Sequence, residues 1–130
     1  MHTDEQTPQD GFTMIELLVV VVIISVLAAI SIPIFLHNRE KAVDASIKSD
    51  LRTVAQAEET EYADSRTYFT ALPSGVALSQ DTTVTIALSG TVPDAYCVVG
   101  SNPSASQSWV YVSNGGGLQD RSVHACPSGF

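Results

Sequence analysis

The three histidines are the first residues that could support catalysis, and they do not form a catalytic pattern. His2, His37 and His124 lie far apart in the 130-residue chain. None has a nearby Ser or Cys nucleophile together with a carboxylate that would orient its ring, which is the arrangement that nucleophilic catalysis needs. The sequence therefore predicts that the protein is not an enzyme.

The groups that could bind a ligand lack the necessary spacing as well. Asn114 precedes three glycines, but neither a helix start nor a Lys-Ser/Thr pair follows, so a flexible turn is favoured over a phosphate site. Two groups of acidic residues match no cation-binding loop: Glu58, Glu59 and Glu61, and Asp81, Asp94 and Asp120. For the first group a charged, solvated helix face is favoured. We therefore expect no metal and no cofactor.

One carboxylate has unusual surroundings. Glu16 precedes a run, from Leu17 to Leu36, in which only two serines and Pro33 are not strongly apolar. About 20 such residues suffice for a helix to cross the hydrocarbon core of a membrane. An ionised side chain at the centre of a membrane helix costs roughly 2.5–3.5 kcal/mol, and less toward its edge. We therefore expect Glu16 to have a specific electrostatic partner.

The apolar run continues into an amphipathic segment, so a single long helix is expected. From His37 to Ala63, apolar residues recur every three or four positions and charged residues occupy the others. A helix from Phe12 to about Ala63 would contain about 52 residues and extend about 78 Å. Its buried face is expected to contain Val43, Ile47, Leu51, Val54, Ala55 and Tyr62.

Pro33 is the one interior defect of this predicted helix. Proline lacks the N–H that would bond to the carbonyl of Ala29, and its ring crowds that carbonyl. We therefore expect the helix to kink or to unwind locally at Pro33.

The two cysteines are expected to pair. Cys97 and Cys126 both lie in the C-terminal third of a chain that we expect to be exported, and exported cysteines usually form disulfides. Such a bond would close a loop of about 30 residues and stabilise the fold by roughly 3–4 kcal/mol. A disulfide is favoured over free thiols and over a metal site, because His124 and Cys126 lack a second ligand pair.

From Asp64 onward the composition changes to Ser, Thr, Gly and Pro with short β-rich runs. Three of these runs predict the strands of an antiparallel meander: Thr82–Leu88, Tyr96–Val99 and Trp109–Val112. Alternation in the first run directs Val84, Ile86 and Leu88 inward, toward the amphipathic half of the helix.

These elements predict an α+β fold. A long N-terminal α-helix, membrane-spanning in its first half and amphipathic in its second, packs on a small antiparallel β-sheet with a disulfide-tied C-terminal segment.

The size and charge of the chain exclude several classes of function. A chain of 130 residues has room for one membrane span and one small domain. Its formal net charge is −8, and beyond Ser65 the only basic residues are Arg66 and Arg121. Because no cluster of Lys and Arg could neutralise a phosphate backbone, direct binding of nucleic acid is not expected.

The residues Gly11-Phe12-Thr13-Met14-Ile15-Glu16, followed by an unbroken apolar helix, closely resemble the N-terminus of type IV pilins and pseudopilins. The resemblance implies that a prepilin peptidase cuts between Gly11 and Phe12 and methylates the new amine of Phe12. Glu16 matches the family's glutamate four residues after the mature N-terminus, and Pro33 matches a proline common in the middle of the pilin helix.

The resemblance also implies a role for Glu16 in assembly. A methylated amine keeps its positive charge, so Phe12 would present an ammonium group in an apolar setting where Glu16 is costly alone. In staggered helices, Glu16 of one subunit can meet Phe12 of its neighbour. That pairing would set the axial register of a filament.

The chain then divides into four parts: a cleaved leader (1–11), a transmembrane and filament-core helix (12–36), the amphipathic half of the same helix (37–63) and a β-sheet head (64–130). Removal of the leader leaves six basic and eleven acidic side chains, a net charge of −5. Acidic leaders resemble those of some Gram-positive pilins.

The orientation in the membrane is expected to place the N-terminus in the cytoplasm. Arg39 and Lys41 follow the span, so the positive-inside rule alone would favour the opposite orientation. However, the leader must reach the peptidase and the cysteines must reach an oxidising space.

The resemblance implies a structural subunit, the major pilin of a type IV pilus, which passes from the plasma membrane into an extracellular filament. Expected partners are further copies of the chain, prepilin peptidase, the inner-membrane assembly platform, minor pilins and, before assembly, membrane lipid. One alternative is a pseudopilin of a type II secretion or DNA-uptake machine. An alternative of another class is a monomeric, single-pass membrane-anchored extracellular binding domain.

Overall fold

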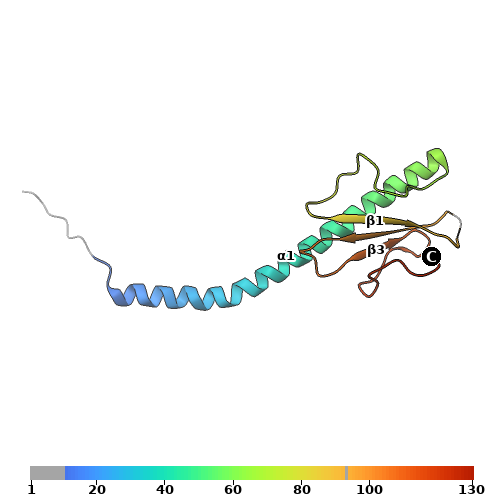
Figure 1. Ribbon diagram of the computed structural model, residues 1–130. Coiled ribbons are helices and arrows are strands. Elements are labelled where there is room, and N and C mark those ends of the chain that lie inside the picture. Colours follow the sequence, from blue (N-terminus) through green and yellow to red (C-terminus); the bar gives the residue numbers. More distant parts are fainter. Residues whose placement is uncertain (1–10, 93) are drawn as a thin grey trace, which may run out of the picture. The chain divides into compact units, whose positions relative to one another are not determined.

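The computed structural model describes residues 11–92 and 94–130 (Figure 1). The predicted leader, apart from Gly11, lies outside the described residues. Internal contacts divide the chain into two units, one ending at Leu36 and the other beginning at His37. We call them the N-terminal unit and the C-terminal unit, and each is described by itself.

The first element is the helix α1, Met14–Ser65, of 52 residues. It contains no glycine, and it continues across Pro33. It ends where Arg66 adopts a left-handed conformation, with φ of 60°, and donates its N–H to the carbonyl of Tyr62 at 3.0 Å. A left-handed residue of this kind commonly terminates helices. The long helix predicted from the sequence is confirmed, with both ends two residues later than expected.

The C-terminal unit contains a four-stranded antiparallel sheet in the order β1-β2-β3-β4. The strands are β1 (Thr83–Leu88), β2 (Tyr96–Ser101), β3 (Trp109–Val112) and β4 (Gly117–Leu118). Figure 1 shows the second half of α1 running alongside this sheet. The predicted α+β architecture and its three strands are confirmed.

The sequence interpretation missed β4. The glycines after Asn114 were expected to form a flexible turn, but they connect β3 to β4, and Gly117 pairs with Val112. Gly116 and Gly117 have φ of 88° and 87°, a conformation that other residues adopt only at a cost. A strand of two residues is too short to produce a recognisable alternation in the sequence.

Both faces of the sheet are covered, by different segments. On the face toward α1, buried side chains of the helix and sheet form one cluster: Ile47, Leu51, Val54, Ala55, Ile86, Tyr96, Val98 and Trp109. On the other face, Cys97, Val110 and Val112 pack with side chains of the C-terminal segment, including Val123 and Phe130. Because β2 is covered on both faces from Tyr96 to Gly100, this part of the strand shows no alternation of apolar and polar residues.

One glycine sets the approach of β2 to α1. A Cβ atom at Gly100 would lie 2.7 Å from Cγ2 of Ile47 and 3.1 Å from Cδ2 of Leu51. Real Cβ atoms do not come that close to other carbon atoms, so the packing of strand on helix at this point requires glycine.

Leu88 differs from its prediction. Val84 and Ile86 pack in the cluster against α1, as expected, but Leu88 is exposed. It is the last residue of β1, an edge strand, and it does not belong to the cluster of side chains that packs on α1. Alternation along a strand predicts which face a side chain occupies, and it does not predict whether that face is covered there.

Three acidic residues of α1 are buried, although the sequence pattern placed them at charged, solvated positions. They are Asp44, Asp50 and Glu58. Each accepts a hydrogen bond from the backbone N–H of a loop residue, Ser106, Ser79 and Phe69 respectively. The expectation of a solvated Glu58 is wrong because the loop after α1 folds back on the helix and needs an acceptor there.

Candidate functional site

The N-terminal unit presents a continuous apolar surface. Large apolar side chains from Phe12 to Leu36 are exposed, and Phe12 itself is 84% exposed. Among the described residues, α1 is the one helix long and apolar enough to cross a membrane, with a mean hydropathy of 3.1 over an 18-residue window. Such a surface requires lipid or other apolar helices around it.

Thr13 and Glu16 form a capping box at the start of α1. The hydroxyl oxygen of Thr13 accepts the N–H of Glu16 at 3.3 Å. In return, Oε2 of Glu16 accepts the N–H of Thr13 at 2.9 Å and its hydroxyl at 2.7 Å. This reciprocal pattern satisfies groups that the first turn of a helix leaves unpaired, and the helix dipole favours a negative charge there.

Thr13 is a residue of this site that the sequence interpretation missed. The pattern Thr-x-x-Glu directly before an apolar run is the signature of a capping box, so the signal was present in the sequence.

One carboxylate oxygen of Glu16 is left without a hydrogen bond among the described residues. Both bonds from Thr13 end on Oε2, and Oε1 accepts no hydrogen bond from the residues that the structure describes. The carboxylate lies in a shallow depression of about 380 Å³ whose other lining residues are Phe12, Ile15, Val19 and Val20. The structure therefore brings Glu16 and Phe12 to one apolar depression, with Gly11 immediately before it.

The two serines of the apolar run satisfy their hydroxyls within the helix. Ser25 donates to the carbonyl of Val21 at 2.7 Å, and Ser31 donates to the carbonyl of Leu27 at 2.8 Å. Such bonds let a serine sit in an apolar environment without an unpaired donor. The kink expected at Pro33 stays a prediction.

In the C-terminal unit, a disulfide joins Cys97 and Cys126, whose Cα atoms are 5.9 Å apart. It ties the C-terminal segment to β2, the strand buried on both faces. The disulfide-tied C-terminal segment predicted from the sequence is confirmed.

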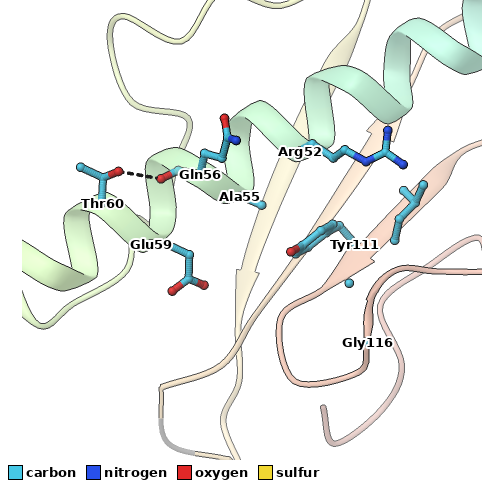
Figure 2. Close-up of a pocket in the computed structure, with 9 residues that line it drawn as sticks. Arg52, Ala55, Gln56, Glu59, Thr60, Tyr111 and Gly116 are labelled. Carbon is cyan, nitrogen blue, oxygen red and sulfur yellow. Dashed lines mark hydrogen bonds between the residues drawn. The ribbon is translucent and has the colours of Figure 1, made fainter.

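An open polar groove lies between α1 and the hairpin of β3 and β4. Its volume is about 870 Å³, and its lining includes Arg52, Glu59, Tyr111 and Gly116. Figure 2 shows the side chains of Arg52 and Glu59 extending from α1 near Tyr111. The groove contains one carboxylate, Glu59, and one guanidinium, Arg52, and offers a polar contact surface.

Another pair of titratable residues lies at the start of the C-terminal unit. The ring of His37 lies 3.7 Å from the carboxylate of Glu40. Within residues 11–92 and 94–130, no three His, Cys, Asp or Glu side chains are placed to hold a metal ion together.

Comparison with known proteins places these features in a family. Residues 7–32 match the model of the prokaryotic N-terminal methylation motif. The chain is 32% identical over 92 residues to the type IV wide pilus major component PilA4 of Thermus thermophilus, which covers 68% of this chain and 70% of that protein. It is 36% identical over 58 residues to the type IV major pilin protein PilA of Myxococcus xanthus, and 39% identical over 60 residues to the type II secretion system core protein G of Klebsiella pneumoniae.

The last two matches are shorter. They cover 45% and 46% of this chain, but only 26% and 43% of the respective relatives. The fold and the site define a chain with an apolar N-terminal helix, a carboxylate at the edge of that helix and a small disulfide-tied sheet. The chain belongs to the family of type IV pilins and their pseudopilin relatives.

Proposed function

We propose that this chain is the major subunit of a type IV pilus, cut between Gly11 and Phe12, methylated on Phe12 and polymerised through α1. The observation that supports this proposal is the position of Glu16, whose Oε1 is uncommitted in an exposed apolar depression that also contains Phe12. A charge kept at that position needs a cationic partner once the surface around it is covered.

The partner is the amine that cleavage creates on Phe12 of a neighbouring subunit. Within one chain, Phe12 precedes the start of α1 at Met14, and Thr13 already occupies Oε2 of Glu16. Oε1 can accept the neighbour's ammonium while Oε2 keeps the capping box. The capping box thus holds the carboxylate in place, and the charge pair sets the axial register between neighbouring subunits of the filament.

The rest of the N-terminal unit forms the core of the filament. Because the apolar side chains of α1 exchange lipid for neighbouring helices, the transfer changes their hydrophobic environment little. Packing and the charge pair then decide the arrangement of subunits.

The same proposal gives the partners and the location. The precursor is a single-pass protein of the plasma membrane with its N-terminus in the cytoplasm and its disulfide-tied part outside, where thiols are oxidised. It meets prepilin peptidase, the assembly platform and minor pilins, and it acts as a structural subunit and not as an enzyme.

A pseudopilin is the second candidate, and the similarity to core protein G of the type II secretion system favours keeping it. The two candidates differ in product: a major pilin yields long surface filaments, and a pseudopilin yields short fibres within a secretion or DNA-uptake machine. A monomeric anchored binding domain would not need Glu16 and would remain monomeric in detergent and at the cell surface.

The test separates processing from assembly. Mass spectrometry of the mature chain is expected to find methylated Phe12 as the first residue. Glu16→Gln keeps the capping box, which accepts glutamine, but removes the charge. It leaves the Phe12 amine without its counter-ion at every contact, which costs about 3–5 kcal/mol. Sheared filaments should therefore fall by roughly a hundredfold or more.

Glu40→Gln, which removes an acid from the C-terminal unit, is the matched control and should assemble normally. Wild-type filament yield from Glu16→Gln would disprove the assembly role, and a mature chain that does not begin at Phe12 would disprove the processing step.

A further inference from the structure

The carboxyl group of Glu58 lies entirely inside the C-terminal unit, where α1 meets the loop that follows it. Its side chain is 0% exposed. Oε2 accepts the N–H of Phe69 at 2.9 Å, whereas Oε1 is buried and accepts no hydrogen bond from the described residues. A buried carboxylate oxygen without a partner is costly when charged and much less so when it carries a proton.

The titratable groups that act on Glu58 are acids and a phenol: Glu59 and Glu61 on α1, and Tyr68 from the loop. Tyr68 is in turn surrounded by Tyr62 of α1, Tyr96 of β2 and Asp94 of the connection before β2. Arg66, the nearby cation, lies over the ring of Tyr62 at 5.7 Å. Within the described part of the chain, no Lys, Arg or His nitrogen lies within 4.0 Å of a Glu58 oxygen.

These surroundings favour the neutral acid. Burial is the largest influence and raises the pKa of Glu58. The hydrogen bond from Phe69 comes second and lowers it, but burial together with the charges of Glu59 and Glu61 keeps the pKa above its ordinary value. Ionisation would strengthen the bond from Phe69, but that one bond does not replace the hydration that the carboxylate loses on burial.

We propose that Glu58 is a proton-dependent latch on the loop after α1. When protonated, it stays buried and holds the segment of residues 66–72 against α1 through the N–H of Phe69. When ionised, it turns toward water, and the segment separates from the helix while the sheet and the disulfide stay in place.

The direction of the pH effect follows from proton binding. The closed state holds its proton more tightly than an open state in which Glu58 has the ordinary pKa of 4.5. Closure is therefore fully favoured below that value, and it weakens as the pH rises through the pKa of the closed state. With one proton involved, the closing equilibrium changes by at most about tenfold per pH unit.

Hydrogen exchange of the Phe69 amide, measured by NMR on the full chain in detergent micelles, tests the latch. After correction for the intrinsic effect of pH, wild-type protection should fall by up to tenfold per unit as the pH rises from the ordinary value of 4.5 through the raised pKa of the closed state. Glu58→Gln keeps an acceptor for Phe69 but cannot ionise, so its protection should not change with pH. Asp64→Asn, which removes an exposed acid from the same end of α1, should behave as the wild type.

Two results would overturn the proposal. One is the same pH dependence in Glu58→Gln as in the wild type. The other needs no variant: a Glu58 carboxyl carbon that titrates at the ordinary glutamate value in the folded wild-type chain would show that the closed state does not retain the proton.

Discussion

Asp44 and Ser106 are joined by two hydrogen bonds, although 62 positions separate them in the chain. The N–H of Ser106 donates to Oδ1 of Asp44 at 3.0 Å, and its hydroxyl donates to Oδ2 at 2.5 Å. Asp50 holds Ser79 in the same way, with two bonds of 3.0 Å. Two aspartates of α1 therefore each bind one loop, and each accepts hydrogen bonds from the backbone N–H and the hydroxyl of one serine in that loop.

Removal of the Asp44 carboxylate should destabilise the C-terminal unit. Hydrogen bonds to charged groups contribute about 1.5–3 kcal/mol, and the N–H of Ser106 would lose its acceptor, so Asp44→Ala should lower the free energy of unfolding by about 2–3 kcal/mol. Urea unfolding of the full chain in micelles measures the change. Glu40→Ala, a change at a more exposed acid of the same helix, should cost much less; equal losses would contradict the role of the pair.

The same pair predicts a loss of stability in acid. Burial is the largest single influence and favours the neutral form of Asp44, but hydrogen bonds, led by the one from the hydroxyl of Ser106, and the charge of Lys48 together outweigh it and lower the pKa of Asp44. The stabilisation is therefore present above the ordinary value of 3.8 and is lost as the pH falls through the lower pKa of the folded state. Asp44→Asn should show a smaller fall in unfolding free energy over this range, and an unchanged fall would contradict the assignment.

Gly100→Ala should destabilise the packing of β2 on α1. The added Cβ would lie 2.7 Å from Ile47, and overpacking of a well-filled core typically costs about 1–3 kcal/mol. Thermal unfolding followed by circular dichroism measures the effect. Gly90→Ala is the matched control, because a Cβ at Gly90 meets nothing within 4 Å. Equal melting temperatures for the two variants would disprove the close approach.

Loss of the disulfide should weaken the C-terminal unit without removing α1. The cysteines are 29 positions apart, and a loop of that length corresponds to a stabilisation of roughly 3–4 kcal/mol. The double variant Cys97→Ser and Cys126→Ser should unfold at a correspondingly lower urea concentration. Reductant should lower the midpoint of the wild type and leave that of the double variant unchanged; a shift in both would point to another cause.

Tyr96→Phe should cost about 1 kcal/mol, because its buried hydroxyl lies 3.1 Å from Oε1 of Glu59 and 3.3 Å from the carbonyl of Ala55. Burial, followed by the charge of Glu59, raises the pKa of Tyr96 above its ordinary value of 10.0. Stability should therefore fall as the pH rises above about 10, where the unfolded chain ionises.

Denaturant unfolding at neutral and alkaline pH tests both parts of the prediction. Tyr111→Phe is the control, since the hydroxyl of Tyr111 makes no hydrogen bond to the described residues, and it should leave the neutral stability nearly unchanged. A wild-type tyrosinate signal from all tyrosines at the ordinary pKa, before unfolding, would contradict the burial effect.

The sequence alone determined the features that depend on neighbours along the chain. Three features are local patterns of this kind: the apolar run from Leu17 to Leu36, the recurrence of apolar residues every three or four positions after it, and the Gly11-Phe12 junction with Glu16. They predicted one long helix and the family. With only two cysteines in the chain, a disulfide had only one possible pairing.

Only the tertiary structure decided which polar groups are buried and what they bind. No local pattern indicates that the loops carrying Phe69, Ser79 and Ser106 return to α1, so Glu58, Asp50 and Asp44 looked like members of a solvated face. The burial of a side chain depends on what covers it, and the residues that bind these carboxyl groups lie 11, 29 and 62 positions away in the chain. Once those loops are in place, their N–H groups require acceptors, and the carboxyl groups of the helix supply them.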